Sequence, residues 1–268
     1  MKRSLFFAYG VICYLLFLGI YAYFCAFTAN VLTPWSIDAP VVGSWQSAVA
    51  INLALLAAFG IQHSVMARPA FKQVWTRIIP LPIERSTYLL ASFIVLALFM
   101  WQWRPIDAIV WDVQNPFGRV VLWALFAAGW LMVPAVSLMI SHFDLFGLRQ
   151  VWLHFQGREY EPLPFRTPLL YGHIRHPLYV GWALAFWATP TMTAGHLLFA
   201  VGLTGYMMAA ALVEERDLIA HFGHQYMAYR QSVPRYLPKL GKQSTPPRES
   251  QLTAPVPPGG STTREVLS

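Results

Sequence analysis

Six apolar segments, separated by short polar stretches, run through most of the chain. They cover residues 5–28, 46–66, 86–103, 120–141, 178–188 and 196–213. About 20 apolar residues are needed to cross a bilayer as a helix, and five of the six segments come close to that length. The fifth has about 11–13 residues, or roughly 20 Å at helical rise. We therefore predict an all-α integral membrane protein, a bundle of five to six transmembrane segments that ends in a helical hairpin. In this hairpin the short segment is a tilted arm packed on its neighbours.

Downstream of the last apolar segment the sequence changes character twice. From residue 214 to about residue 230, Leu218, Phe222, Tyr226 and similar residues recur three and four positions apart. This spacing predicts an amphipathic helix that continues from the sixth segment. Residues 243–268 are rich in Ser, Thr and Pro and lack apolar periodicity, so we expect a disordered tail. The rest, residues 1–242, is predicted to be one membrane domain.

The placement of basic residues orients this bundle. Of the 19 Lys and Arg residues, only Arg104 and Arg119 fall on the side opposite the N-terminus, and the other 17 fall on the same side as the N-terminus. The positive-inside rule assigns the side with more basic residues to the cytoplasm. Both termini are therefore predicted to be cytoplasmic. The net charge of +7 arises from this bias and favours contact with anionic lipid head groups rather than nucleic acid. With 12% charged residues against about 25% in soluble domains, the composition excludes an ordinary soluble protein.

Metal chemistry receives little support. The only cysteines, Cys13 and Cys25, lie in one apolar segment, about 18 Å apart along a helix axis, which is too far for a disulfide. Two His-x-x-His pairs are present, at 173/176 and at 221/224, but Pro177 places the first pair at a helix boundary. We predict no metal site.

The strongest candidate for a binding site lies at the two feet of the predicted hairpin. Arg175-His176-Pro177 precedes its first helix, and Glu214-Glu215 follows the apolar part of its second. Pro177 suits the first turn of a helix, whose positive end, together with Arg175 and His176, would attract a carboxylate or phosphate. Two carboxylates at a helix C-terminus oppose the helix dipole, which is a local conflict typical of functional sites. They could bind ribose hydroxyls, an ammonium or a sulfonium.

Structural alternatives remain open for these residues. The Arg-His pair could simply anchor a helix among lipid head groups, and the glutamates could form a solvated face with Arg216 as counter-ion. His63, at the inner end of the second segment, is an ionisable residue within or at the membrane, which indicates function. It could also serve helix packing through a hydrogen bond.

These motifs resemble a known superfamily of membrane enzymes. The matching residues are Arg175, His176, Pro177, Tyr179, Gly181, Glu214, Glu215, Tyr226 and Tyr229, ahead of Val233-Pro234-Arg235. In this order they are similar to the isoprenylcysteine carboxyl methyltransferase and phospholipid methyltransferase superfamily, over residues 171–238. Residues 59–68, 84–88 and 142–150 narrow the resemblance to the subgroup that methylates methanethiol and to its NnrU-like relatives.

The resemblance implies a cytoplasmic pocket for S-adenosylmethionine at the hairpin foot. Carried over residue by residue, the cofactor pocket would consist of Tyr171, His173, Arg175, His176, Tyr179, Glu214 and Glu215. His176 and Arg175 would hold the methionyl carboxylate, and Glu214 or Glu215 would take ribose hydroxyls or the amino group.

The implied reaction is methyl transfer to a small volatile thiol, most simply methanethiol to dimethyl sulfide, in a bacterial inner membrane. The thiolate is the nucleophile and a free thiol has a pKa near or above about 8.5, so a base is wanted. The candidates for this base are His142, His63, Tyr88 and Asp144. An apolar thiol can enter from the bilayer, and the thioether can leave the same way.

Other functions remain possible within and outside the superfamily. The acceptor could be a prenylcysteine carboxylate or a phospholipid amine, and the protein could be a non-catalytic NnrU-like membrane factor. A transporter is disfavoured because the spans lack deep charge pairs. The sequence carries no signal for the oligomeric state.

Overall fold

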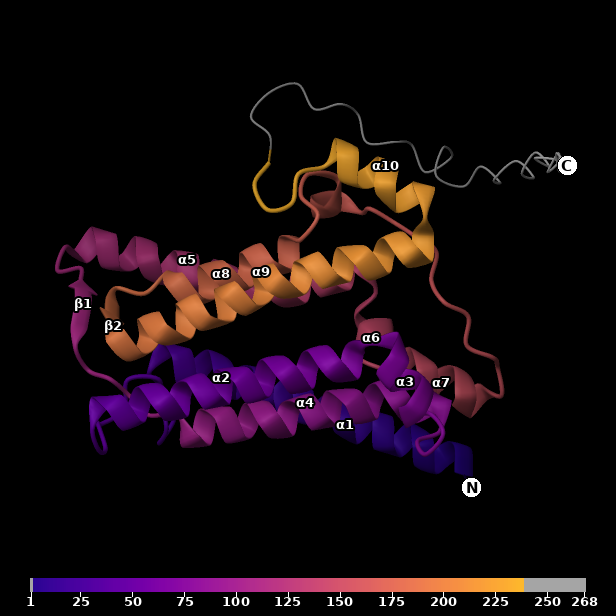
Figure 1. Cartoon of the computed structure of the whole chain (residues 1–268), viewed down its shortest axis with the longest axis horizontal. Coiled ribbons are helices and arrows are strands. Elements are labelled where there is room, and N and C mark those ends of the chain that lie inside the picture. Colours follow the sequence, from indigo (N-terminus) through magenta and orange to yellow (C-terminus); the bar gives the residue numbers. More distant parts are fainter. Residues whose placement is uncertain (1, 239–268) are drawn as a thin grey trace, which may run out of the picture.

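The computed structural model describes residues 2–238 and is mostly helical (Figure 1). Five of its helices are long and apolar enough to cross a membrane: α1 (Lys2–Ala29), α2 (Trp45–Ala67), α4 (Leu81–Gln102), α5 (Pro116–Ile140) and α9 (Ala194–Phe222). Many of their large apolar side chains, such as Leu131 and Val120, are exposed, as expected for surfaces that face lipid. The predicted tail at residues 243–268 lies outside the described residues.

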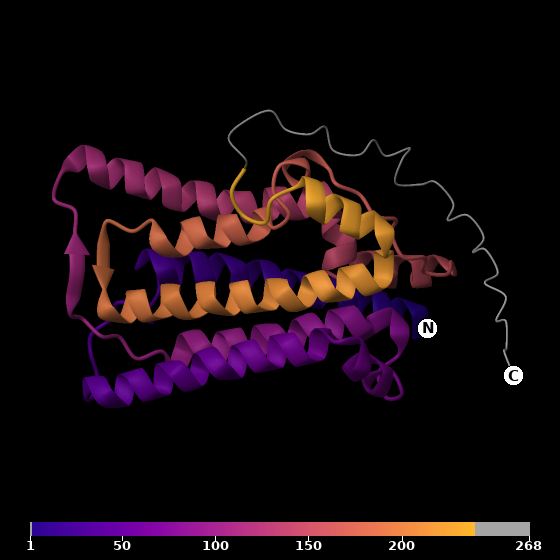
Figure 2. The ribbon, with the colours of Figure 1, turned by 45° about the horizontal axis from the view of Figure 1, so that its top comes forward.

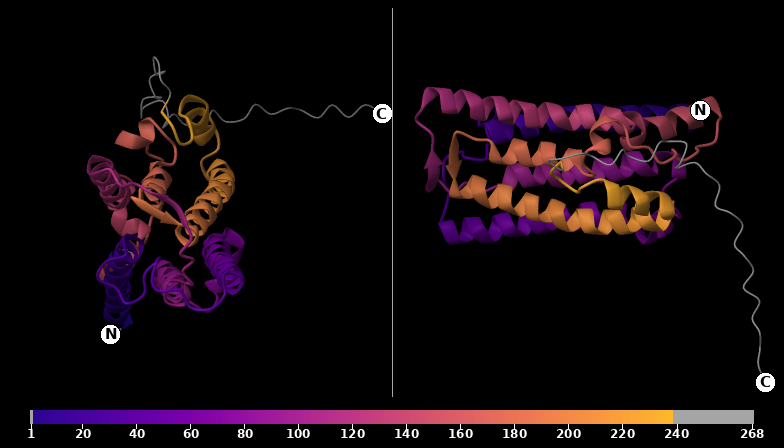
Figure 3. Two further views of the ribbon diagram at one scale, coloured as in Figure 1. Left: turned by 90° about the vertical axis from the view of Figure 1, so that its left-hand side faces the viewer. Right: turned by 90° about the horizontal axis from the view of Figure 1, so that it is seen from above.

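The helices form two layers that meet in an aromatic core. Helices α1, α2 and α4 lie in one layer and α5, α8 and α9 in the other (Figures 1 and 3). Phe24 of α1, Phe99 of α4 and Phe199 of α9 are almost fully buried where the layers meet. Their rings lie edge-on or tilted to one another, which is a favourable arrangement for aromatic side chains.

Helix α8 (Pro177–Trp187) has 11 residues and is too short to span a bilayer alone. It lies between α5 and α9 (Figure 2) and packs most closely on α5. Two glycines allow this approach: a Cβ atom at Gly129 would lie 2.5 Å from the backbone nitrogen of Ala185 and 2.8 Å from the carbonyl oxygen of Gly181. Small residues at such contacts let helix backbones touch, as is common in membrane bundles.

The two ends of the bundle differ in structure. One end, which we call the strand end, carries β1 (Ile109–Asp112) and β2 (Thr191–Thr193), an antiparallel pair in the register Ile109↔Thr193 and Asp112↔Thr191. The all-α prediction did not include this pair. Its first strand is rich in β-branched and aromatic residues, but it is too short to show a period of two.

The other end, the polar end, holds the N-terminal start of α1 and several short elements (Figure 1). These are α3 (Pro69–Trp75), α6 (His142–Leu145), α7 (Leu148–Gln156), the 3₁₀ turn η1 (Leu169–Gly172) and α10 (His224–Ser232). All the basic residues of the described chain except Arg104 and Arg119 belong to segments at this end.

The predicted continuous helix from residue 214 to residue 230 is wrong in one respect. Helix α9 carries on past the apolar segment to Phe222, as expected, but the chain then breaks at Gly223 before α10 begins. Gly223 has a φ of 55° and a ψ of −126°, a conformation that glycine adopts far more readily than other residues. The break turns α10 back along α9 and brings the segment after it to the start of α8 (Figures 1 and 3).

Candidate active site at the polar end

A buried carboxylate, Glu215 of α9, lies at the centre of the polar end. Only 2% of the residue is exposed, and its two oxygens take part in four hydrogen bonds with arginine and histidine side chains. Arg175 Nε lies 3.0 Å from Oε1, His176 Nε2 3.1 Å from Oε1, and Arg235 places Nε 3.1 Å from Oε1 and Nη2 2.8 Å from Oε2. Arg230 Nε of α10 lies 3.8 Å from Oε2 as well, so Glu215 has partners from three segments of the chain.

Arg175 also has several hydrogen-bond partners. Besides Glu215, its Nη1 donates to the carbonyl oxygen of Arg230 at 2.9 Å. The backbone nitrogens of Arg175 and His176 donate to the carbonyls of Pro234 and Arg235 at 2.9 and 3.1 Å. These bonds fasten the segment after α10 to the residues just before α8. Because α9 continues to Phe222, Glu215 lies about two turns before the helix end, so the expected conflict with the helix dipole does not arise; the cost that the two arginines offset is that of burying the carboxylate.

The neighbouring Glu214 is in a different environment. Its side chain is 47% exposed, and Oε2 accepts a hydrogen bond from the Tyr179 hydroxyl at 2.8 Å. His176 Nδ1 lies 3.8 Å from the same oxygen. Within residues 2–238, no arginine pairs with Glu214. Its carboxylate is therefore available to a ligand, unlike that of Glu215.

Several tyrosines lie near Glu214. Those within electrostatic range of its carboxylate, besides Tyr179, are Tyr171, Tyr206, Tyr226 and Tyr236. Burial, and then the nearby Glu214, raise the pKa of Tyr171, and burial followed by Glu215 raises that of Tyr226 to about 12. These hydroxyls are therefore protonated at neutral pH. A carboxylate with several tyrosines nearby is a site that suits a cation with little hydration, such as a sulfonium or an alkylammonium.

The other residues of the predicted pocket lie at the edge of this cluster. The carbonyl oxygen of Tyr171 accepts the Tyr229 hydroxyl at 2.7 Å, which joins η1 to α10. His173 is exposed, and its Nδ1 lies 3.1 Å from the carbonyl oxygen of Leu169. Arg235, Tyr206 and Tyr236 were not among the predicted site residues. In the sequence, only the position of Arg235 directly after Val233-Pro234 pointed to it. Nothing in the sequence distinguished Tyr206 and Tyr236 from the other tyrosines.

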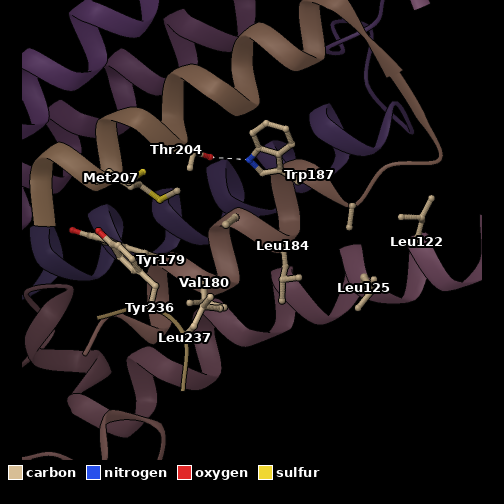
Figure 4. A pocket seen from close by; sticks show the side chains of 13 residues that line it. Leu122, Leu125, Tyr179, Val180, Leu184, Trp187, Thr204, Met207, Tyr236 and Leu237 are labelled. Carbon is tan, nitrogen blue, oxygen red and sulfur yellow. Dashed lines mark hydrogen bonds between the residues drawn. The ribbon is translucent and has the colours of Figure 1, made fainter. Parts of the chain in front are cut away.

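An apolar groove leads away from the cluster between α5, α8 and α9 (Figure 4). Its volume is about 530 Å³. Tyr179 and Tyr236 stand at one end of it, and in this view their hydroxyls point to the same side. The Tyr236 hydroxyl is buried and has no hydrogen-bond partner within the described residues. We call this feature, from Tyr179 to Ala188, the α8 groove.

Of the four predicted bases, His63 and Tyr88 lie together. The Tyr88 hydroxyl is 3.0 Å from either ring nitrogen of His63, and Ser92 Oγ is 3.2 Å from Nδ1. His63 stacks on Phe59, which also contacts Tyr206 of α9. A chain of aromatic contacts therefore runs from His63 towards the tyrosines around Glu214.

The other two predicted bases lie in separate networks. His142 has Ser137 Oγ 2.7 Å from Nδ1 and the Tyr14 hydroxyl 2.8 Å from Nε2, and burial lowers its pKa. Asp144 pairs with Arg149 Nη1 at 2.9 Å and accepts a hydrogen bond from the Tyr160 hydroxyl. Across the described chain, no three His, Cys, Asp or Glu side chains are grouped to hold a metal ion.

Comparison with known proteins finds relatives that match this chain along nearly its whole length. No family model and no solved structure matches the chain. A methanethiol S-methyltransferase from Mycobacterium tuberculosis is 50% identical over 238 residues, which are 89% of this chain and 98% of that protein. One from Crocosphaera subtropica is 48% identical over 91% of this chain and 96% of that protein. The mouse protein nurim is 31% identical over 64% of this chain and 68% of its own. With identity this high across almost the entire length of the bacterial relatives, the chain belongs to the methanethiol S-methyltransferase family.

Proposed function

We propose that this protein methylates a small thiol, methanethiol to dimethyl sulfide, with S-adenosylmethionine as the donor. The observation that carries the proposal is the 50% identity to a protein of that name over 98% of its length. The membrane bundle supports it, because a small apolar thiol and its thioether both dissolve in the bilayer around five apolar helices. The basic residues at the polar end support a cytoplasmic site, with both termini on that side of an inner membrane.

The residues at the polar end fit this donor. When bound, S-adenosylmethionine supplies an electrophilic methyl group on a positively charged sulfur. Glu214 offers a carboxylate that no arginine of the described chain neutralises, and the buried Tyr236 hydroxyl has a free hydrogen-bonding capacity. The proposed pocket is the predicted set: Tyr171, His173, Arg175, His176, Tyr179, Glu214 and Glu215.

The contacts suggest two roles for the residues of this pocket, facing the ligand and positioning the residues that face it. Glu214 and the tyrosines around it would face the ligand, with Glu214 balancing its positive charge. Arg175 and Glu215 spend their polar groups on each other and on the backbone, so we propose that they position the ligand-facing residues. His176 bridges the two groups, because its ring lies 3.1 Å from Glu215 and 3.8 Å from Glu214.

The base that receives the thiol proton is proposed to be His63, assisted by Tyr88. The imidazole has a hydroxyl on both sides, which can fix its tautomer and pass a proton onward. Aromatic contacts through Phe59 and Tyr206 connect it to the Glu214 cluster. The partners of His142 and Asp144 lie outside the Glu214 cluster, on other elements such as α5 for Ser137 and α7 for Arg149.

The test is headspace gas chromatography of cells that express the protein and receive methanethiol. We expect dimethyl sulfide from the wild type and from Glu159→Gln, a control at an exposed site, but little from Glu214→Gln or Arg175→Ala. No dimethyl sulfide from wild-type protein that is present in the membrane would overturn the proposal. Prenylcysteine and phospholipid acceptors, added in parallel, test the related activities. Binding of the donor without any turnover would favour a non-catalytic membrane factor.

A further inference from the structure

The α8 groove is much larger than methanethiol requires. Methanethiol has one carbon, whereas cavities of about 300–1,000 Å³ typically bury drug-sized ligands. At about 530 Å³ the groove falls within that range. From Tyr179 to Ala188 it follows nine helical steps, or about 13 Å of α8. This length suits an extended hydrocarbon chain.

Polarity is concentrated at one end of the groove. At its head, the Tyr179 hydroxyl donates to Glu214, and the Tyr236 hydroxyl is buried without a partner among residues 2–238. Farther along, Trp187 Nε1 donates to Thr204 Oγ1 at 2.9 Å, which satisfies both polar groups within the wall (Figure 4). The remaining lining is apolar, as with Val180 and Leu184. This distribution matches a ligand with a polar or reactive head and an apolar tail.

The head of the groove is also the edge of the proposed methyl-transfer site. Tyr179 belongs to both, because its ring lines the groove and its hydroxyl binds Glu214. A chain that lies in the groove would therefore have its terminal atom beside the Glu214 cluster. The head of any chain in the groove would thus lie at the proposed methyl-transfer site, as an acceptor substrate requires.

We propose that the α8 groove binds the hydrocarbon chain of apolar thiols longer than methanethiol, so that the enzyme also methylates straight-chain alkanethiols such as butanethiol and hexanethiol. The inference rests on the proposed function. The acceptor sulfur gives its proton to a base, forms the new bond to the methyl carbon and leaves as an alkyl methyl thioether. The electron pair of the broken carbon–sulfur bond stays with the donor, which departs as a neutral thioether.

Chain length supplies a quantitative expectation. Each methylene moved from water into the groove contributes ~0.8 kcal/mol, which corresponds to about a fourfold rise in kcat/KM at equal aqueous concentration. Because longer thiols also concentrate in the bilayer, the wild type alone cannot separate the groove from the membrane. A substitution that fills the groove separates the two effects, because it leaves the partition into the bilayer unchanged.

The experiment measures methylation of methanethiol, butanethiol and hexanethiol in membrane vesicles that contain the full chain. Leu184→Trp places a large side chain in the groove, and Ala183→Phe does so from the adjacent position should the first variant fail to fold. Leu131→Trp is the matched control, because Leu131 lies on α5, is 70% exposed and does not line the groove. We expect the hexanethiol-to-methanethiol ratio of kcat/KM to fall at least tenfold in the groove variants and to stay at the wild-type value in the control.

Two results would overturn the inference while leaving the proposed function intact. One is wild-type turnover of methanethiol without butanethiol or hexanethiol. The other is a hexanethiol ratio that the groove variants do not change, which would mean that the chain lies elsewhere, for instance in the bilayer. Absence of methanethiol turnover in the wild type would instead remove the proposed function and this inference with it.

Discussion

Substitution by glutamine should destabilise the protein much more at Glu215 than at the adjacent Glu214. Glu215→Gln leaves Arg175 and Arg235 without their counter-charge in a site where Glu215 itself is 2% exposed. Removing one partner of a buried ion pair costs about 3–5 kcal/mol, and the partial exposure of Arg235 puts the expected loss near the lower end, at about 3 kcal/mol. Glu214→Gln affects a half-exposed side chain with one tyrosine hydrogen bond, so the stability loss should be about 1 kcal/mol or less.

Donor binding, unlike stability, should be clearly impaired by Glu214→Gln. Glu214→Gln retains a folded protein yet loses the charge that faces the proposed ligand, so we expect it to bind the donor poorly while keeping near wild-type stability. The assay pairs unfolding in mixed detergent micelles, titrated with SDS, with donor binding by calorimetry on the same samples. Equal destabilisation by Glu214→Gln and Glu215→Gln would refute the division of roles argued from burial.

A double-mutant cycle tests the cause of the Glu215 effect. Glu215→Gln and Arg235→Gln should be strongly non-additive, with a coupling of about 1–3 kcal/mol, because each removes the other's partner. The control is Glu215→Gln combined with Arg149→Gln, whose guanidinium pairs with Asp144 instead. Additive behaviour of the first pair would mean that the contacts at 2.8 and 3.1 Å contribute little.

Three further predictions follow from other contacts. Gly129→Val should separate α5 from α8 and cost about 1–3 kcal/mol in the same SDS titration, because its Cβ meets backbone atoms, whereas Gly205→Ala, with open space around it, should be neutral or slightly stabilising. His63→Gln should lower methyl transfer about 100-fold at neutral pH and far less once the pH exceeds the pKa of the thiol, where the thiol ionises unaided; a pH-independent loss would argue against a base. Because burial lowers the pKa of His142 from 6.5, the unfolded state binds the proton more readily, so stability should fall as pH drops below 6.5; His142→Gln should flatten that part of the thermal-unfolding profile.

Much of the bundle could be predicted from hydrophobic pattern alone. Segment length separates the five spanning helices from α8, because crossing a bilayer sets a minimum number of apolar residues. The motif around Arg175 and Glu215 also indicated a polar cluster, since charges beside apolar segments are costly unless they are used. These predictions depend on local composition, which a sequence displays directly.

The parts that could not be predicted depend on tertiary contacts. Glu214 and Glu215 differ by about 100° around a helix, and only the packing of α8 and Arg235 decides which one is buried. The four candidate bases look equivalent in the sequence, yet Tyr14 and Ser137 occupy His142 while Tyr88 joins His63. The turn at Gly223 was missed because apolar spacing continues across it, although a glycine beside a polar stretch was a local sign.

The fastening of residues 175–176 to 234–235 has a consequence for biosynthesis. The five spanning helices end at Phe222, so all of them can enter the membrane before the ribosome has released Arg235. At that stage Glu215 has Arg175 beside it, while Arg235 is still inside the ribosome. The polar end is thus completed last, by a segment that never enters the bilayer as a span, and a released chain that stops before Arg235 would contain all five spans but leave Glu215 without this partner.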